Sequence, residues 1–94
     1  MEVSTFYGTL KPDNLIDWIG ELEDFFELEE IKDPLWVRLS QTKLEGHASL
    51  WWKELQRDRE DEGETKINRW RLMVTKLKAK FIPVDYENDL FKKL

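Results

Sequence analysis

The fold is decided by Leu44-Glu45-Gly46-His47-Ala48-Ser49-Leu50-Trp51-Trp52, a turn that leads into two adjacent tryptophans. A third tryptophan, Trp70, stands on the next expected helix, so three of the chain's five tryptophans lie on two successive helices. Each buried indole removes roughly 150–250 Å² of surface from water. A domain of 94 residues buries a modest share of its surface, so large rings are an efficient way to build its core. The stretch therefore predicts a compact helical core.

Two helices are expected before this turn. Asp13 to Glu30 carries apolar residues at steps of three and four, the pattern of a helix with one buried stripe. Gly20 lies inside this helix and predicts the close approach of a neighbouring element. Asp33-Pro34 predicts the start of a second helix, because aspartate caps and proline fits the first turn. This helix runs to about Leu44, and Gly46 fits the left-handed position that ends a helix.

A third helix follows the turn almost at once, from about His47 to Arg59. Its inner face is expected to carry Ala48, Trp51, Trp52 and Leu55. Successive helical residues point about 100° apart, so one ring of the Trp51-Trp52 pair could lie in the core and the other at a rim or groove wall. The favoured interpretation is that both rings simply pack in the core, since aromatic stripes usually do. The charge-dense stretch from Arg57 to Glu64 is expected to form an exposed loop.

A fourth helix is expected from Asn68, which is placed as its cap, to the residue before Pro83. Its apolar stripe begins at Trp70 and ends at Phe81. Asp85 is then placed to cap a last short helix. No stretch alternates like a surface strand, so the chain is expected to be all-α.

The predicted architecture is a single domain over residues 1–94, a small orthogonal bundle of about five helices. Residues 1–12 form an extended arm and residues 13–94 the bundle. Phe6 and Tyr7 are expected to dock the arm onto the bundle.

Composition excludes several classes of protein. The chain has no cysteine, which excludes a disulfide framework, a thiolate zinc site and a cysteine nucleophile. No apolar run approaches the ~18 residues of a membrane span, and no signal peptide opens the chain. A cytoplasmic protein without membrane contact is expected.

The net charge of −5 is unevenly distributed. Residues 1–64 carry 17 acids and 7 bases, whereas residues 65–94 carry 3 acids and 8 bases. Asp13 to Glu30 holds eight acids and no base, and Lys66 to Lys80 holds six bases and no acid. The overall acidity argues against a primary nucleic-acid binder. The asymmetry favours electrostatic complementarity within the fold or between copies.

No catalytic, cofactor or metal site is expected. His47 is the only histidine, and a metal site needs several converging ligands. The acids between Asp58 and Glu64 lack the spacing of a calcium loop, because Gly63 is misplaced for that frame. Carboxylates such as Glu21 and Glu54 are abundant, but no nucleophile or phosphate-binding glycine loop accompanies them. The chain is therefore expected not to be an enzyme.

Several motifs occur together, in an order and at distances that are specific as a set. They are Phe6-Tyr7-Gly8, Trp18, Leu22-Glu23-Asp24-Phe25-Phe26, the block from Leu44 to Trp52, Ile67-Asn68-Arg69-Trp70 and Lys80-Phe81-Ile82-Pro83-Val84-Asp85-Tyr86. In these motifs the chain resembles the N-terminal lobe of the capsid region of Gag from gypsy-type long-terminal-repeat retrotransposons, in the version found in plant elements.

The resemblance implies a function. In that family the domain is a small helical bundle that helps to assemble Gag into a particle around the element's RNA, so weak contacts with other Gag copies are expected. The neuronal protein Arc is a domesticated relative whose corresponding lobe binds short peptides in a hydrophobic groove, which gives the alternative of a host-peptide module. The family normally continues into a second lobe and a Cys-Cys-His-Cys zinc knuckle. The 94 residues hold neither, so an excised lobe or a domesticated remnant is expected.

The resemblance and the helical stripes together define a motif core. Its residues are Phe6, Trp18, Leu22, Phe25, Phe26, Leu44, Gly46, Ala48, Trp51, Trp52, Trp70, Phe81, Pro83 and Tyr86. The candidate partner surface consists of Phe6, Tyr7 and Trp36. Trp36 stands where relatives tend to carry a polar residue, so its ring is expected to be exposed.

The basic fourth helix leaves three interpretations open. Its lysines and arginines are a solvated face, a weak contact to RNA phosphates, or a contact to the acidic first helix of a neighbouring copy. Ring or lattice assembly through the last contact would be head-to-tail. RNA binding by this lobe is expected to be weak or absent.

Overall fold

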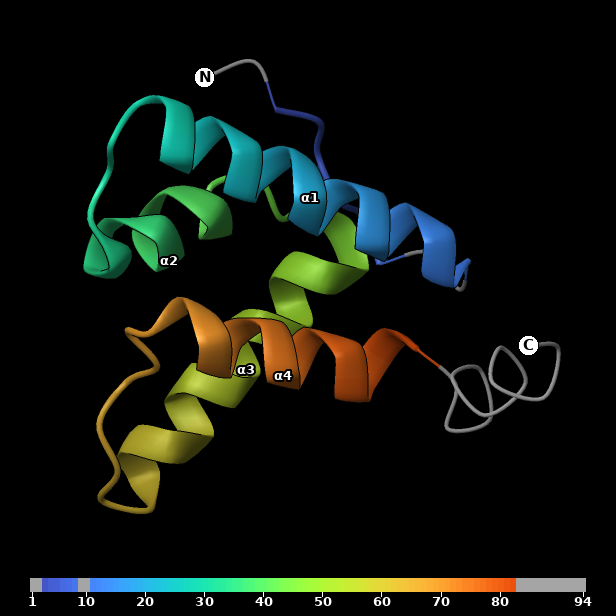
Figure 1. Cartoon of the computed structure of the whole chain (residues 1–94). Coiled ribbons are helices and arrows are strands. Elements are labelled where there is room, and N and C mark those ends of the chain that lie inside the picture. The colour runs from blue at the N-terminus through green and yellow to red at the C-terminus, as the bar shows by residue number, and fades with distance from the viewer. Residues whose placement is uncertain (1–2, 9–10, 83–94) are drawn as a thin grey trace, which may run out of the picture.

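A computed structural model describes residues 3–8 and 11–82 of the chain. These residues form four helices, α1 (Pro12–Leu28), α2 (Asp33–Gln41), α3 (Gly46–Asp61) and α4 (Trp70–Phe81), shown in Figure 1. The all-α prediction is confirmed for the described residues, but they contain four helices where about five were expected. The last helix, expected from Asp85, lies outside the described residues, as do Pro83 and Tyr86.

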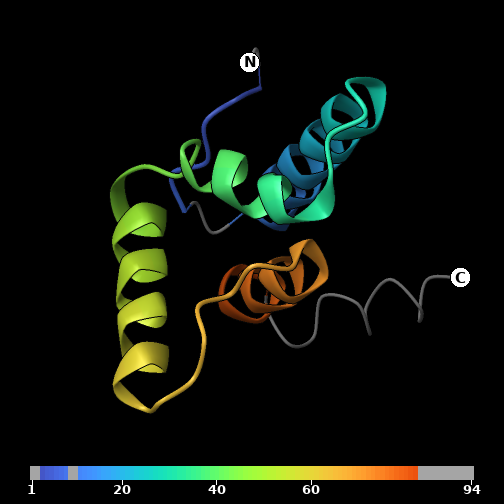
Figure 2. The same cartoon turned by 90° about the vertical axis from the view of Figure 1, so that its left-hand side faces the viewer.

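The helices form a layered bundle. α1 and α4 run in roughly opposite directions on one side, and α4 packs against both α1 and α2. α3 crosses behind them at a steep angle, and its second half projects away from the body (Figures 1 and 2). The extended arm, residues 3–8, runs between α1 and the segment that joins α2 to α3.

The core is built mainly from aromatic rings and from the predicted stripe of α1. The stripe buries Leu15, Trp18, Ile19, Leu22 and Phe26. The Phe26 ring centroid lies 5.1 Å from that of Trp36 and 6.0 Å from that of Trp70. The contact with Trp70 is edge-on, an arrangement that aromatic pairs favour. Two apolar residues of α1 are left outside, because Ile16 is 40% exposed and Leu28, at the end of the helix, is 81% exposed.

Helix α4 is capped by a residue from another helix. Asn68 is not its cap; the structure places Arg69 there, with no side-chain cap bond. Instead the backbone N–H of Trp70 donates to Oδ1 of Asp33 at 2.8 Å. Asp33, expected to cap α2, is the first residue of that helix and serves the start of α4. A cap supplied across the bundle has no local sequence signal, which is why the prediction failed.

The end of α2 also differs from the prediction. α2 ends at Gln41, so Leu44 is free to leave the helix and pair with the arm. Gly46 does take the predicted left-handed backbone, with φ of +57°, but it begins α3. The short interval between the two helices makes room for the arm.

Helix α3 is longer than expected and ends at Asp61, so the first part of the predicted loop belongs to this helix and the connection to α4 is residues 62–69. Polar bonds hold this connection to α3. The amide of Gln56 accepts from the N–H of Ile67 at 2.9 Å and donates to its carbonyl oxygen at 3.3 Å. Arg59 donates to the Thr65 carbonyl oxygen and pairs with Glu64 at 3.0 Å. The exposed loop is therefore ordered by its polar groups.

Two glycines exchange their expected roles. A Cβ at Gly20 would have nothing within 4 Å, so no element approaches there and that prediction is wrong. Gly8, in contrast, has φ of +88°, and a Cβ would lie 3.0 Å from the backbone nitrogen of Ala48. The same Cβ would lie 3.2 Å from the Phe81 ring. The close approach in this fold belongs to the arm.

Candidate functional site

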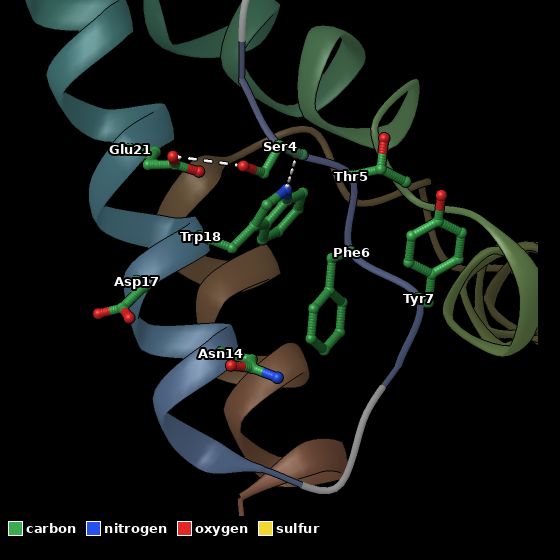
Figure 3. A pocket seen from close by; sticks show the side chains of 8 residues that line it. All are labelled: Ser4, Thr5, Phe6, Tyr7, Asn14, Asp17, Trp18 and Glu21. Atoms are coloured by element: carbon green, nitrogen blue, oxygen red, sulfur yellow. Dashed lines mark hydrogen bonds between the residues drawn. The ribbon is translucent and has the colours of Figure 1, made fainter.

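A cleft of about 390 Å³ opens between the arm and α1. Figure 3 shows its lining, in which Phe6, Asn14 and Trp18 lie between the two elements and Asp17 points away on the far side of α1. The eight lining residues are Ser4, Thr5, Phe6, Tyr7, Asn14, Asp17, Trp18 and Glu21.

The arm forms one wall of the cleft because its backbone is held on the opposite side. The Phe6 N–H donates to the Lys43 carbonyl oxygen at 2.8 Å, and the Glu45 N–H donates to the Phe6 carbonyl oxygen at 3.0 Å. These two bonds make a parallel bridge between Phe6 and Leu44. Residues 3–8 are extended, and Phe6 joins them to Leu44 by a pairing that local sequence pattern does not reveal.

Trp18 joins the arm to the α1 wall. Its indole N–H donates to the Ser4 carbonyl oxygen at 2.7 Å, and the Ser4 hydroxyl donates to Glu21 at 3.4 Å. The Phe6 ring packs 5.5 Å from Trp18 and 5.2 Å from Phe81, measured between ring centroids. The floor is apolar and already filled, whereas the rim is polar.

Tyr7 and Gly8 turn the arm away from the cleft. The Tyr7 carbonyl oxygen accepts from the N–H of Ala48 at 3.4 Å, and the Tyr7 ring lies beside Gly46. Tyr7 remains 55% exposed, so the expectation that both Phe6 and Tyr7 dock is correct for Phe6 alone. The position of Gly8 directly after two aromatic residues could have marked it as a turn of the arm. No sequence pattern marked Asn14 as a residue of the cleft.

The chemistry of the cleft suits contact rather than catalysis. The charged group that faces the arm is the carboxylate of Glu21, and the other polar groups are hydroxyls, an amide and the arm backbone. Such a rim favours a short segment that brings a cation or hydrogen-bond donors. Across residues 3–8 and 11–82, no three metal-binding side chains are grouped to hold an ion. His47 is exposed at the start of α3.

Most of the motif core lies together in the interior. The buried members are Phe6, Trp18, Leu22, Phe26, Leu44, Ala48, Trp52, Trp70 and Phe81. Phe25 and Trp51 are partly buried against this core, and Gly46 is exposed. Trp52 is 4% exposed, and Trp51 is partly buried and packs on Phe81 with 5.3 Å between ring centroids, so both rings pack against the interior.

The same residues are matched by a family comparison. Residues 1–82 match the family described as the N-terminal capsid-like domain of the retrotransposon-derived protein PEG10. The chain belongs to this family of capsid-like domains. The matched range includes the arm and all four described helices. Comparisons with curated proteins and with solved structures gave no match.

The family match supports the Gag-type, capsid-like assignment. The narrower gypsy-type and plant assignments stay predictions. Within the described part of this capsid-like domain, no helix is long and apolar enough to cross a membrane.

Of the three candidate partner residues in the capsid-like domain, only Tyr7 is exposed. Phe6 is 3% exposed and belongs to the core. The exposed ring expected at Trp36 is wrong, because Trp36 is partly buried, packs on Phe26 and donates its indole N–H to the Ile31 carbonyl oxygen. A partner role for any of the three stays a prediction.

Proposed function

We propose that this domain is a structural N-lobe of a Gag-type capsid and makes repeated protein–protein contacts in a retrotransposon-type particle. The family match over residues 1–82 is the observation that carries this proposal. The aromatic interior supports it, because a rigid block is what a repeating shell requires of each copy. The proposal includes the narrower assignments to a gypsy-type element of the plant kind and to the cytoplasm.

Weak contacts are sufficient for this function. Neighbouring contacts in a closed shell raise the effective concentration of every further contact, so each can be feeble. The proposed domain is no enzyme and needs no cofactor. RNA contact through α4 is at most a weak, salt-sensitive addition, since the whole domain has a net charge of −5.

Tethering tests the assembly function at high local concentration. The chain, carrying a terminal histidine tag, is bound to nickel-lipid tubes and imaged by electron microscopy. An ordered lattice is expected at high surface density, and imidazole should disperse it. A helical protein of similar size and charge, tethered in the same way, is the control. A disordered coat at full density contradicts the proposal.

The cleft beside the arm favours a second candidate function, a domesticated module that binds a short host peptide. The cleft offers the Ser4 hydroxyl on the arm and the Glu21 carboxylate on α1. Screening a library of short random peptides, followed by fluorescence polarisation, tests it. Glu21→Gln should weaken binding, whereas Glu54→Gln, which makes the same change at an exposed position of α3 outside the cleft, should not. Equal effects of the two variants would exclude the cleft as the binding site.

A further inference from the structure

A second groove, separate from the arm, lies between α1 and α4. Its volume is about 380 Å³. Glu23 of α1 and Asp33 at the start of α2 form one wall, and Arg71 and Lys78 of α4 form the other. Val74 and Trp70 provide an apolar floor. The two charge blocks of the sequence therefore meet at one groove.

A hydrogen bond fixes the acidic wall of the groove beside the start of α4. Glu23 accepts a hydrogen bond from the Trp70 indole N–H at 3.2 Å. Glu27 lies one turn further along the same face of α1, because residues four apart are neighbours on a helix. Glu23 therefore stands level with the first turn of α4, which contains Arg71, and Glu27 lies one turn of α1 (about 6 Å) from Glu23. Glu27 and Arg71 are both exposed.

The charges of this groove are not consumed by ion pairs within the described structure. The salt bridges formed by residues 3–8 and 11–82 are Arg59–Glu64 and Lys66–Glu60, and both lie at α3 and its connection to α4. The groove thus brings acidic side chains from α1 and the start of α2 next to basic side chains from α4.

Such a face is complementary to itself. A two-fold axis that lies along the groove places α1 of one copy over α4 of the other, and the reverse. Glu23 and Glu27 of each copy then face Arg71 of its partner, which gives two equivalent acid–base contacts. A head-to-tail contact between these acidic and basic side chains, as the charge pattern suggested, suits faces on opposite sides of the molecule.

We propose that the α1–α4 face is a self-complementary contact surface whose occupant is a second copy of this chain, related by a two-fold axis. The proposal rests on the proposed function, since it names one of the copy-to-copy contacts that assembly uses. Exposed ion pairs are weak individually, so the contact is weak and sensitive to salt. The surface of α1 is open at Gly20, where a Cβ would meet nothing within 4 Å.

Charge reversal at Glu27 and Arg71 tests the pairing. Glu27→Lys puts a base in the last turn of α1, and Arg71→Glu puts an acid in the first turn of α4. Both changes suit the helix dipole, so neither variant should unfold, and circular dichroism verifies this. Glu54→Lys and Lys53→Glu make the same charge changes at exposed positions of α3 and are the matched controls.

Sedimentation equilibrium over a concentration series supplies the readout. Self-association of either groove variant should be about tenfold or more weaker than that of the unchanged chain, because two contacts turn repulsive at once. The α3 controls should associate as the unchanged chain does. An equimolar mixture of the Glu27→Lys and Arg71→Glu chains should form a one-to-one dimer, since both contacts become complementary again.

Several outcomes overturn the proposal. They are an unchanged chain that stays monomeric at every concentration reached in low salt, groove variants that associate like the α3 controls, a mixture no stronger than its components, or growth beyond a dimer. The lipid-tube test separates these failures from failure of the proposed function. If Arg71→Glu forms lattices as well as the unchanged chain does, the groove contact is contradicted and the assembly function is not. If a salt-sensitive dimer forms but no lattice does, the assembly function is contradicted and the groove contact is not.

Discussion

The interior around α1, α2 and α4 and the projecting half of α3 are stabilised in opposite ways. In the first region rings pack against rings, and Phe26 alone contacts Phe25, Trp36 and Trp70. In the second region, from Gln56 onward, the helix and its connection to α4 are joined by hydrogen bonds of the Gln56 side-chain amide and by ion pairs. Figure 2 shows this part of α3 extending beyond the body.

The difference teaches where the domain is cooperative. Apolar burial is shared among many neighbours, so loss of one ring weakens the whole interior. Polar bonds in a partly exposed segment contribute little each and can open locally without global unfolding. We expect substitutions in the interior to lower the global free energy of unfolding, and substitutions in the projecting part to act locally.

Phe26→Ala should have the largest effect. Phe26 is fully buried, and its loss leaves a cavity between Trp36 and Trp70. The free energy of unfolding, measured by urea denaturation, should fall by about 3–5 kcal/mol. Phe25→Ala is the matched control, because Phe25 is the same residue type one position earlier and is only partly buried. Equal losses from the two variants would mean that the interior is not centred on Phe26.

Gly8→Ala tests how the arm packs on the first region, because Gly8 lies against Ala48 in the first half of α3 and Phe81 of α4. A side chain there combines a left-handed φ of +88° with a 3.0 Å contact to backbone. Unfolding free energy should fall by about 2 kcal/mol or more. Gly20→Ala, in open space within α1, should instead raise stability by about 0.5–1 kcal/mol, since alanine is the better helix former. Similar signs for the two glycines would contradict the packing of the arm.

Gln56→Ala should produce a smaller and local effect. It removes both bonds to the Ile67 backbone, which should cost about 1–2 kcal/mol. Hydrogen exchange should speed up at residues 62–69 while amides of α1 keep their protection. Gln56→Glu retains an acceptor for the Ile67 N–H and should recover part of the loss. Uniformly faster exchange throughout the chain would show that the connection belongs to the cooperative interior.

Sequence pattern predicts the interior well and the connections poorly. The spacing of Leu15, Trp18, Leu22 and Phe26 placed the stripe of α1 correctly because helical periodicity is a local property. The cap from Asp33 to Trp70 joins residues from two helices, and no local signal encodes such a bond. The same reason explains why Asn68 was taken for the cap.

The candidate cleft was only half accessible to sequence reasoning. Phe6 and Tyr7 were identified from their motif, but their opposite exposures follow from the Phe6–Leu44 bridge and from Gly8, which are tertiary features. Trp36 was misjudged because exposure was inferred from its residue type, whereas burial depends on Phe26 and Trp70 coming to meet it. The charge blocks were visible in sequence; their arrangement along one groove was not.

Ser40→Ala should have the smallest effect. It tests the contrast between the two regions at a polar group that lies inside the apolar region. The Ser40 hydroxyl is a polar group inside the apolar region, fully buried, with no hydrogen-bond partner among the described residues. A buried hydroxyl without a partner costs free energy, and alanine also favours the helix, so stability should stay unchanged or rise by up to about 1 kcal/mol. Ser40→Cys fills the site with a slightly larger side chain that is a weaker donor, so it separates loss of polarity from loss of packing. If alanine lowers the unfolding free energy by more than about 1 kcal/mol while cysteine does not, the site requires the volume of a side chain. If both variants lower it, the hydroxyl has a hydrogen-bond partner, and the interior is less purely apolar than its rings indicate.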